Sequence, residues 1–371
     1  MRRLYSSRGM RPALATVAKL PELLRRSITA FAELAGAGTI ACPEAVGTMR
    51  RRDFLSVIAG ATIWPLAARA QKPTMPVVGL LGPVLTPEQQ VALFGAFRQG
   101  LADSGYVAGK NVAIEERFTS PELAFDAARE LVRRNVNVIF ASVPDTVVAA
   151  RNATTSIPIV ALDLESDPLA KGFIKSLARP GGNMTGMFLD LPELDGKQVG
   201  MLKEIVPRLH RIAIFGIPGL NAVQFDATEM AVRTLGLEAE IMEVRVADDF
   251  EQALAAARTR DVQAGILLSS PLVFIFSKQI GELAIAKRLP LISLFAEFPR
   301  AGGLIAYGPN MSEIFRRCGD SVAKILHGAK PSDLPIQRPE RFDLVINLKT
   351  AATLGLDMPT QLQQLADEVV E

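Results

Sequence analysis

Hydroxyl, acidic and aromatic side chains gather in short loops that follow apolar segments of the chain. The candidate binding residues are Ser142, Asp145, Thr146, Asp163, Asp167, Asn221, Pro271, Phe274, Glu297 and Phe298. Ser142 and Thr146 flank a predicted helix start, whose free N–H groups favour an anion such as a carboxylate. The acids, together with Glu165, supply negative charge, and the phenylalanines supply aromatic faces. This combination suits non-covalent binding of a zwitterion that has an apolar side chain.

Most of these residues also have a purely structural reading. Asp145, Asp167 and Asn221 stand where a helix cap is expected, and caps favour Asp and Asn. Asp163 follows a strand and fits a turn, and Phe274 fits a hydrophobic core. Both readings stay open at the level of the sequence.

Residue types that commonly carry catalysis are sparse. His210 and His327 stand beside predicted helix ends. Ser321 and Lys324 have the spacing of a Ser-x-x-Lys motif, but they lie in the middle of a predicted helix without companion motifs. Cys318 falls on the apolar stripe of the same helix, which favours a buried structural thiol. We therefore expect no enzymatic activity, no cofactor and no metal site.

Short apolar runs alternate with amphipathic segments over most of the chain. Predicted strands are 77–81, 111–118, 136–141, 157–162, 184–187, 212–216, 238–246, 264–269, 291–295, 304–307 and 342–346. Helices are predicted between them, including one ending near Ala178 and a last one at Thr360–Val370. Continuously apolar strands in βα units are typical of parallel sheets covered on both faces. The rhythm restarts after Leu191, so we predict an α/β fold with two similar doubly wound parallel-sheet lobes.

Ligands of open α/β sheets bind beyond the carboxyl ends of the strands. This rule selects the loops 82–86, 142–146 and 163–168 in one half, and 216–221, 269–274 and 295–298 in the other. Facing loops would border one cleft. We expect an amino acid or a similar small amphiphile there.

The segment 49–70 has the order basic, apolar, small that is typical of an export signal. Arg51-Arg52 before Asp53-Phe54-Leu55 fits the twin-arginine variety, although Sec export stays an alternative. The uncharged run Phe54–Ala68 is shorter than the roughly 20 residues of a membrane span. We expect cleavage near Ala70 and a periplasmic product. Residues 1–48 fit a disordered upstream extension, with a transit-type peptide as the alternative.

Charge argues against a nucleic-acid partner. Residues 1–70 hold eleven of the 41 Lys and Arg and four of the 39 Asp and Glu, which leaves 30 basic and 35 acidic side chains. Nucleic-acid binding requires a basic face. We expect no nucleic-acid partner and a monomeric protein.

Several long blocks carry a resemblance to a known family. They are RRDFL with WPLAARAQ, AFRQGLADSGYVAGKNVAIEERF, IPIVALDLESDPLAKGFIKSLARPGGNMTG, AGGLIAYGPN and ILHGAKPSDLPIQRPERFDLVINLKTAATLGL. From Arg51 to Glu371 the chain resembles the substrate-binding proteins of bacterial ABC importers, in the branch related to tryptophan- and tyrosine-binding members. The resemblance implies a type I periplasmic-binding-protein fold, in which two lobes close on a solute about a hinge.

The same resemblance implies a chain path and partners. The first lobe would comprise 76–188 and 308–330, and the second 189–307 and 331–371. A small solute and an inner-membrane ABC permease would be the partners, with a solute sensor for a membrane receptor as the alternative function. Two pocket loops depart from the family pattern: 142–146 reads SVPDT where a Gly-rich string is usual, and 216–221 reads GIPGLN where an Asn-Pro-Asn-like string is usual.

Overall fold

The computed structural model describes residues 75–189 and 192–371. The predicted export signal (49–70) and the predicted extension (1–48) lie outside the described residues and remain predictions. Among the described residues, none of the helices combines the length and the apolar character of a membrane-spanning helix.

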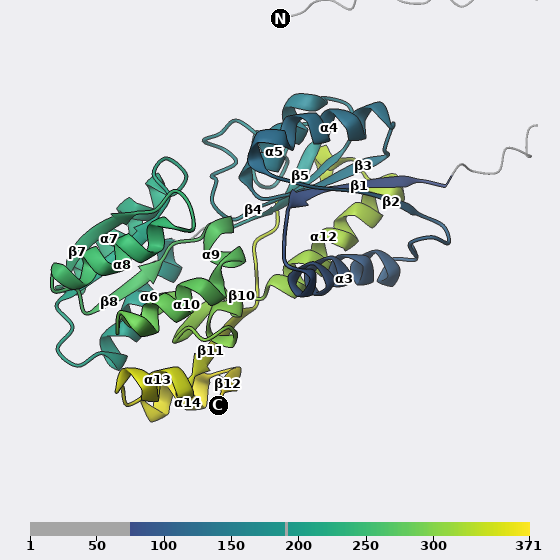
Figure 1. Cartoon of the computed structure of the whole chain (residues 1–371). Coiled ribbons are helices and arrows are strands. Elements are labelled where there is room, and N and C mark those ends of the chain that lie inside the picture. Colours follow the sequence, from purple (N-terminus) through teal and green to yellow (C-terminus); the bar gives the residue numbers. More distant parts are fainter. Residues whose placement is uncertain (1–74, 190–191) are drawn as a thin grey trace, which may run out of the picture. The chain divides into compact units, whose positions relative to one another are not determined.

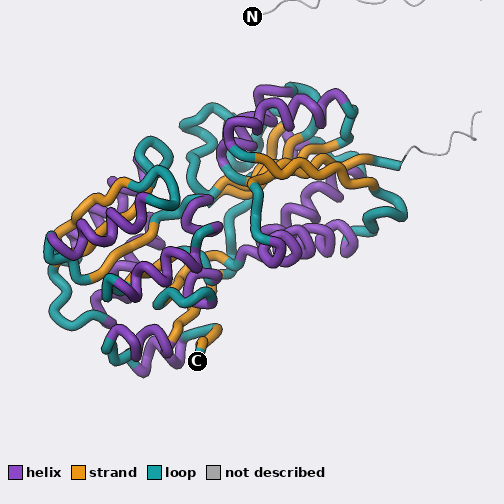
Figure 2. The backbone as a smooth tube through the Cα atoms, in the orientation of Figure 1, coloured by secondary structure: helices purple, strands orange, loops and turns teal. Residues whose placement is uncertain are grey.

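The first sheet has five parallel strands in the order β2-β1-β3-β4-β5. They are β1 (Val77–Pro83), β2 (Ala113–Thr119), β3 (Val138–Ser142), β4 (Ile159–Asp163) and β5 (Met184–Phe188). Every residue of β3, β4 and β5 is buried, as expected when both faces of a sheet are covered. Figure 2 shows helices on both sides of these strands.

Two pairs of helices cover the first sheet (Figure 1). On one face lie α3 (Pro87–Asp103) and α12 (Met311–Leu326); on the other lie α4 (Ala124–Arg133), which the short helix η3 (Pro121–Leu123) precedes, and α5 (Pro144–Ala153). Leu80 packs beneath the first pair and Leu81 beneath the second, as alternation along a strand requires. Thr86 and Gln89 form a complete capping box at the start of α3. We call this sheet and its helices the first lobe.

The second sheet has seven strands in the order β12-β11-β10-β9-β8-β6-β7. They are β6 (Arg211–Gly216), β7 (Glu238–Glu243), β8 (Ala264–Leu267), β9 (Leu291–Ser293), β10 (Ile305–Pro309), β11 (Phe342–Asn347) and β12 (Glu368–Val370). All neighbours are parallel except β10 and β11, which are antiparallel. The prediction of two parallel-sheet lobes is confirmed, with this one antiparallel pair added.

Helices also cover both faces of the second sheet. One group comprises α6 (Pro192–Ile205), α7 (Ala222–Thr234), α13 (Leu348–Leu354) and α14 (Thr360–Leu365); the other comprises α8 (Asp249–Thr259), α9 (Pro271–Ile275), α10 (Ser277–Ala286) and α11 (Glu297–Arg300). Ile214 of β6 faces the first group and Phe215 the second. We call this sheet and its helices the second lobe.

The chain passes between the lobes three times: after β5, after β10, and between α12 and β11. The last connection contains the short helix η4 (Pro331–Asp333) and then runs beside β5. The Gln337 N–H donates to the Gly186 carbonyl at 2.9 Å, and the Phe188 N–H donates to the Gln337 carbonyl at 3.1 Å. The two connections are thus hydrogen-bonded to each other where they leave the first lobe.

Two predicted helices are wrong in part. The stretch after Asp167 forms turns instead of a helix ending near Ala178, because Asp167 Oδ1 caps the Leu169 and Ala170 N–H groups locally and Gly172 takes a positive φ of 65°. The last predicted helix ends at Leu365, and residues 368–370 pair with β11 as β12. Residues 368–370 pair with β11 at the edge of the second sheet, and the local sequence pattern does not reveal this pairing.

Candidate functional site

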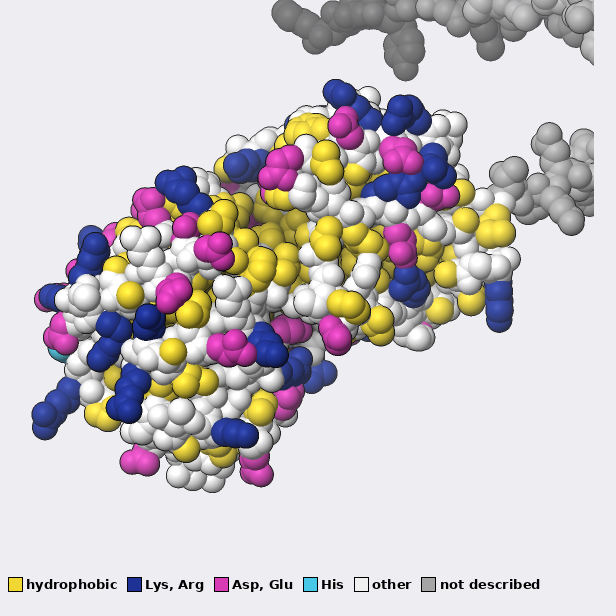
Figure 3. Space-filling view, viewed as in Figure 1, with side chains coloured by type: hydrophobic (Ala, Val, Ile, Leu, Met, Phe, Trp, Pro, Cys, Tyr) yellow, Lys and Arg dark blue, Asp and Glu magenta, His cyan; other side chains and the backbone are white. Residues whose placement is uncertain are grey.

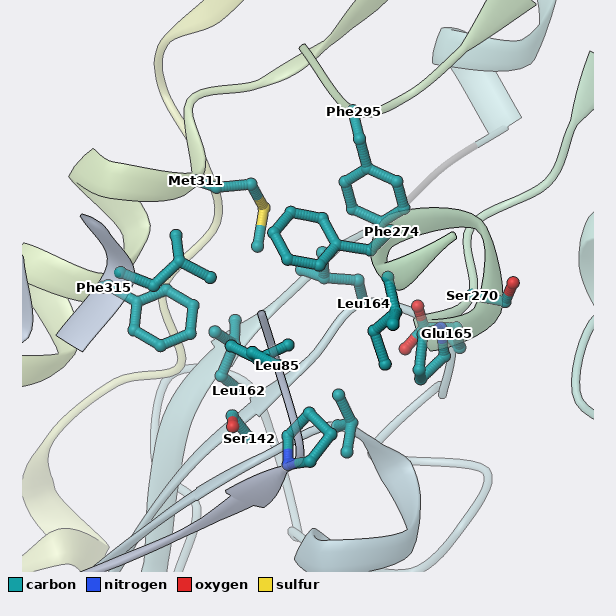
Figure 4. Close-up of a pocket in the computed structure, with 15 residues that line it drawn as sticks. Leu85, Ser142, Leu162, Leu164, Glu165, Ser270, Phe274, Phe295, Met311 and Phe315 are labelled. Carbon is teal, nitrogen blue, oxygen red and sulfur yellow. The ribbon is translucent and has the colours of Figure 1, made fainter. Parts of the chain in front are cut away.

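The carboxyl ends of strands from both lobes surround a small cavity of about 50 Å³, which we call the first chamber (Figure 4). Its walls come from the loops after β1, β3 and β4, from α9 and the loop after β9, and from the first turns of α12. The cavity therefore lies where the parallel-sheet rule places a ligand.

Most of the wall of the first chamber is apolar. Phe274 and Phe295 of the second lobe meet edge to face, with ring centroids 5.1 Å apart. Opposite them lie Met311 and Phe315 of α12, as Figure 4 shows. Hydrophobic side chains also gather in a hollow near the middle of Figure 3, over the region of β4 and α9. Rings and a thioether on two sides suit a flat apolar group.

Ser142 brings a polar atom to the floor of the first chamber. Its side chain is 3% exposed, and its Oγ has no hydrogen-bond partner among the described residues. It ends β3 just before α5, whose first N–H groups carry partial positive charge. Between them Val143 has φ 77° and ψ 151°, a backbone region that favours glycine. A buried, unpartnered hydroxyl at this position is suited to bind an acceptor of a ligand.

Glu165 is the acidic residue of the first chamber. The Ser269 hydroxyl of the second lobe donates to its Oε1 at 2.6 Å. Burial, and next the charge of Asp163, raise the pKa of Glu165 to about 8. Asp163 itself is fully buried, and its Oδ1 accepts from the N–H groups of Glu165 and Ser166 at 3.0 and 2.9 Å. Asp163 therefore shapes the loop that presents Glu165.

A second hydrogen bond joins the lobes beside the aromatic wall. The side-chain amide of Gln89, in the first turn of α3, donates from Nε2 to the Phe274 carbonyl at 3.0 Å. Gln89 also accepts from the Thr86 N–H within the capping box, so its orientation is fixed. The two bonds to Ser269 and Phe274 hold loops of opposite lobes together around the first chamber.

A larger cavity of about 260 Å³ lies next to the first, and we call it the second chamber. Leu164 and Glu165 line both chambers. The remaining wall comes from residues 166–169 and Leu177, from the connections through 188–189 and through Ile336 and Arg338, and from α7. Both lobes and the connections between them thus enclose it.

A family model described as ABC transporter substrate binding protein matches residues 79–370. This chain belongs to that family. A curated tyrosine-binding protein from Clostridioides difficile (strain R20291) is 23% identical to this substrate-binding protein over 264 residues, which span 70% of this chain and 75% of the relative.

Two solved structures share the fold over 80% of this chain and 99% of their own chains. One is an ABC domain from Streptococcus pneumoniae in complex with L-Trp, with 21% identity and a TM-score of 0.73. The other is a conserved domain protein from Vibrio cholerae, with 25% identity and a TM-score of 0.73. The predicted fold class and the family resemblance are both confirmed.

The structure of this substrate-binding protein separates the ten predicted site residues into groups. Ser142, Pro271 and Phe274 line the first chamber, and Asp167 lines the second. Asp163 lines neither chamber and accepts hydrogen bonds from the backbone of the loop that holds Glu165. Asp145 is exposed on the first turn of α5 and lines neither chamber.

The other four predicted site residues line neither chamber. Thr146 Oγ1 donates to the Ser142 carbonyl at 2.5 Å. Asn221 is fully buried and binds the Ile217 N–H and the Ser269 carbonyl. Phe298 is fully buried against Gly303. Burial raises the pKa of Glu297, and its Oε2 has no hydrogen-bond partner in the described part of the chain.

Several chamber residues were not among the ten candidates: Leu85, Leu162, Leu164, Glu165, Ser270, Phe295, Met311 and Phe315. Glu165 belongs to the selected loop 163–168, and its place among the polar residues Asp163, Ser166 and Asp167 is a usable signal. Met311 and Phe315 belong to the stripe of α12, and nothing local distinguishes them from core residues. Across the described ranges, no group of three or more His, Cys, Asp or Glu could hold a metal ion.

Proposed function

We propose that this substrate-binding protein captures an amino acid with an aromatic or other apolar side chain, or a similar small amphiphile, between its two lobes. The first chamber supports this proposal, because aromatic rings and one acid meet there at the carboxyl ends of strands from both lobes. The names of the relatives, a tyrosine-binding protein and a complex with L-Trp, point to the same class of ligand.

Two polar side chains and two rings of the first chamber have roles in this proposal. Glu165 accepts from the ligand ammonium through a carboxyl oxygen, and the Ser142 hydroxyl donates to the ligand carboxylate. The rings of Phe274 and Phe295 pack against the side chain. A ligand that contacts both lobes only when they are closed shifts the population toward the closed form.

The wider role is delivery of this ligand to an ABC importer. Family membership supports it, since the matching family is that of ABC transporter substrate-binding proteins. The predicted lobes, 76–188 with 308–330 and 189–307 with 331–371, would move as bodies about the three connections. We propose that export through the predicted signal places the protein in the periplasm, where the closed form meets the permease.

Isothermal titration of the protein with the twenty amino acids tests the ligand class. We expect L-Trp, L-Tyr or L-Phe to bind, and Phe274→Ala to weaken that binding at least tenfold through loss of ring contact. Phe125→Ala is the matched control, because Phe125 is exposed on α4 and lines neither chamber. Absence of binding across the whole set would reject the proposal.

A further inference from the structure

The volumes of the two chambers bear on the size of the ligand. Small-molecule sites usually enclose about 300–1,000 Å³. The first chamber has about 50 Å³ and the second about 260 Å³, and only Leu164 and Glu165 line both. A ligand held in the first chamber alone would leave the larger space beside it unused.

A buried hydrogen-bond donor faces the second chamber. Gln224 of α7 is 4% exposed and lines this cavity, and its Nε2 has no partner among the described residues. Leaving such a donor unpaired costs about 1–3 kcal/mol. A ligand acceptor in the second chamber would remove this cost.

The partners of Asn221 fix which end of the Gln224 amide faces the cavity. The Ile217 N–H is a donor, so the Asn221 atom 2.7 Å away is the oxygen. The Ser269 carbonyl is an acceptor, so the other Asn221 atom, 2.8 Å away, is the nitrogen. This nitrogen donates to Gln224, which must therefore turn its oxygen toward Asn221 and its NH₂ group toward the second chamber.

The same network continues to the first chamber. Ser269, which accepts from Asn221, donates through its hydroxyl to Glu165. A chain of hydrogen bonds thus connects a free donor in the second chamber with the carboxylate that lines both chambers. The Gln224 NH₂ group is complementary to an acceptor, and Glu165 is complementary to a cation, on one bound molecule.

We propose that the captured molecule extends through both chambers and that Gln224 Nε2 donates to an acceptor oxygen on its extension. The ligand class is then an aromatic amino acid that is joined to a further amide or carboxylate group outside its side chain, as in a short peptide. This inference rests on the proposed function: the apolar part lies in the first chamber, and the extension is bound by the second lobe through α7.

Titration with three probes tests this inference: L-tryptophan, L-tryptophylglycine and glycyl-L-tryptophan. We expect one of the two dipeptides to bind at least tenfold more tightly than L-tryptophan. In Gln224→Glu this preference for the dipeptide over L-tryptophan disappears. This variant keeps an oxygen for Asn221 and replaces only the NH₂ donor.

Two further variants make the result decisive. Gln252→Glu adds the same charge on the exposed surface of α8 and is expected to keep the full preference for the dipeptide. Gln224→Met removes the donor without adding charge and replaces Gln224→Glu if that variant melts at a lower temperature. Binding of L-tryptophan with no gain from either dipeptide, or an equal loss for all probes in both Gln224 variants, overturns this inference alone. Absence of binding for all three probes overturns it together with the aromatic ligand class.

Discussion

Val143 adopts a backbone conformation that side chains with a branched Cβ rarely take. Its φ of 77° occurs immediately before α5, in a loop whose residues line the first chamber. Such strain costs of the order of 1–3 kcal/mol and is kept only where the surrounding structure enforces it. Val143 therefore holds a glycine-like conformation without being glycine.

We expect Val143→Gly to raise the free energy of unfolding by about 1 kcal/mol, because release of strain exceeds the added entropy of the unfolded chain. Urea denaturation measures the change. Val246→Gly, at an exposed position with no positive φ, is the control and is expected to lose up to about 1 kcal/mol. A Val143→Gly variant less stable than the wild type would show that this conformation is not strained.

Glu165 makes stability depend on pH. Its pKa rises from 4.5 to about 8 on folding. Between these values the folded protein keeps a proton that the unfolded chain has released, so the free energy of unfolding decreases as pH rises through this window. We expect melting temperatures of Glu165→Gln to fall less than those of the wild type between about pH 5 and 8.

Asp195→Asn is the control for this prediction, because burial also raises the pKa of Asp195, to about 7, but Asp195 lines neither chamber. Both variants should flatten the pH dependence, and only Glu165→Gln should weaken binding of L-tryptophan. Parallel wild-type and Glu165→Gln melting curves over this range would contradict a protonated Glu165.

At the scale of elements, α3 and α12 depend on two glycines where they cross. A Cβ on Gly100 would lie 1.9 Å from the Arg316 carbonyl oxygen, and one on Gly319 would lie 2.2 Å from the Phe97 carbonyl oxygen. Because the helices cross closely, Phe315 of α12 packs against two rings of the first lobe. Its ring centroid lies 5.5 Å from that of Phe94 and 5.6 Å from that of Phe140. The position of one chamber wall is therefore set by the contact between these helices.

We expect Gly100→Ala to lower the free energy of unfolding by about 1–3 kcal/mol or more, since backbone would have to move. Gly95→Ala on the same helix has no atom within 4 Å of the new Cβ and is expected to gain up to about 1 kcal/mol from helix propensity. Chemical denaturation of both variants checks the prediction, and equal effects would show that the crossing tolerates a methyl group.

At the scale of the whole molecule, two side-chain hydrogen bonds, from Gln89 and from Ser269, join the lobes at the first chamber. Gln89→Glu keeps the oxygen of the capping box but replaces the NH₂ group that donates to the Phe274 carbonyl. Since a hydrogen bond contributes about 1 kcal/mol, we expect about fivefold weaker binding of L-tryptophan and a larger radius of gyration in X-ray scattering. Gln90→Glu, the neighbouring position, is the control. An unchanged radius and affinity would show that this bond does not favour closure.

Local patterns were sufficient for most of the fold, because strands, caps and helix stripes depend on residues near one another in the chain. The apolar runs at β3 and β4 and the capping box at Thr86 are of this kind. The strand-end rule also placed Ser142, Pro271 and Phe274 at the first chamber. The antiparallel β11 and the strand β12 escaped prediction because pairing along a sheet edge is not a local property.

The sequence alone therefore determined two parallel-sheet lobes and the loops that could meet a ligand. Only the tertiary structure decided which side chains do so. Asn221 and Phe298 are buried and stabilise the second lobe. Met311, Phe315 and Gln224 line the chambers instead. The physical reason is that a binding site is a convergence of distant segments, and whether a polar atom is satisfied depends on partners that lie far away in the chain.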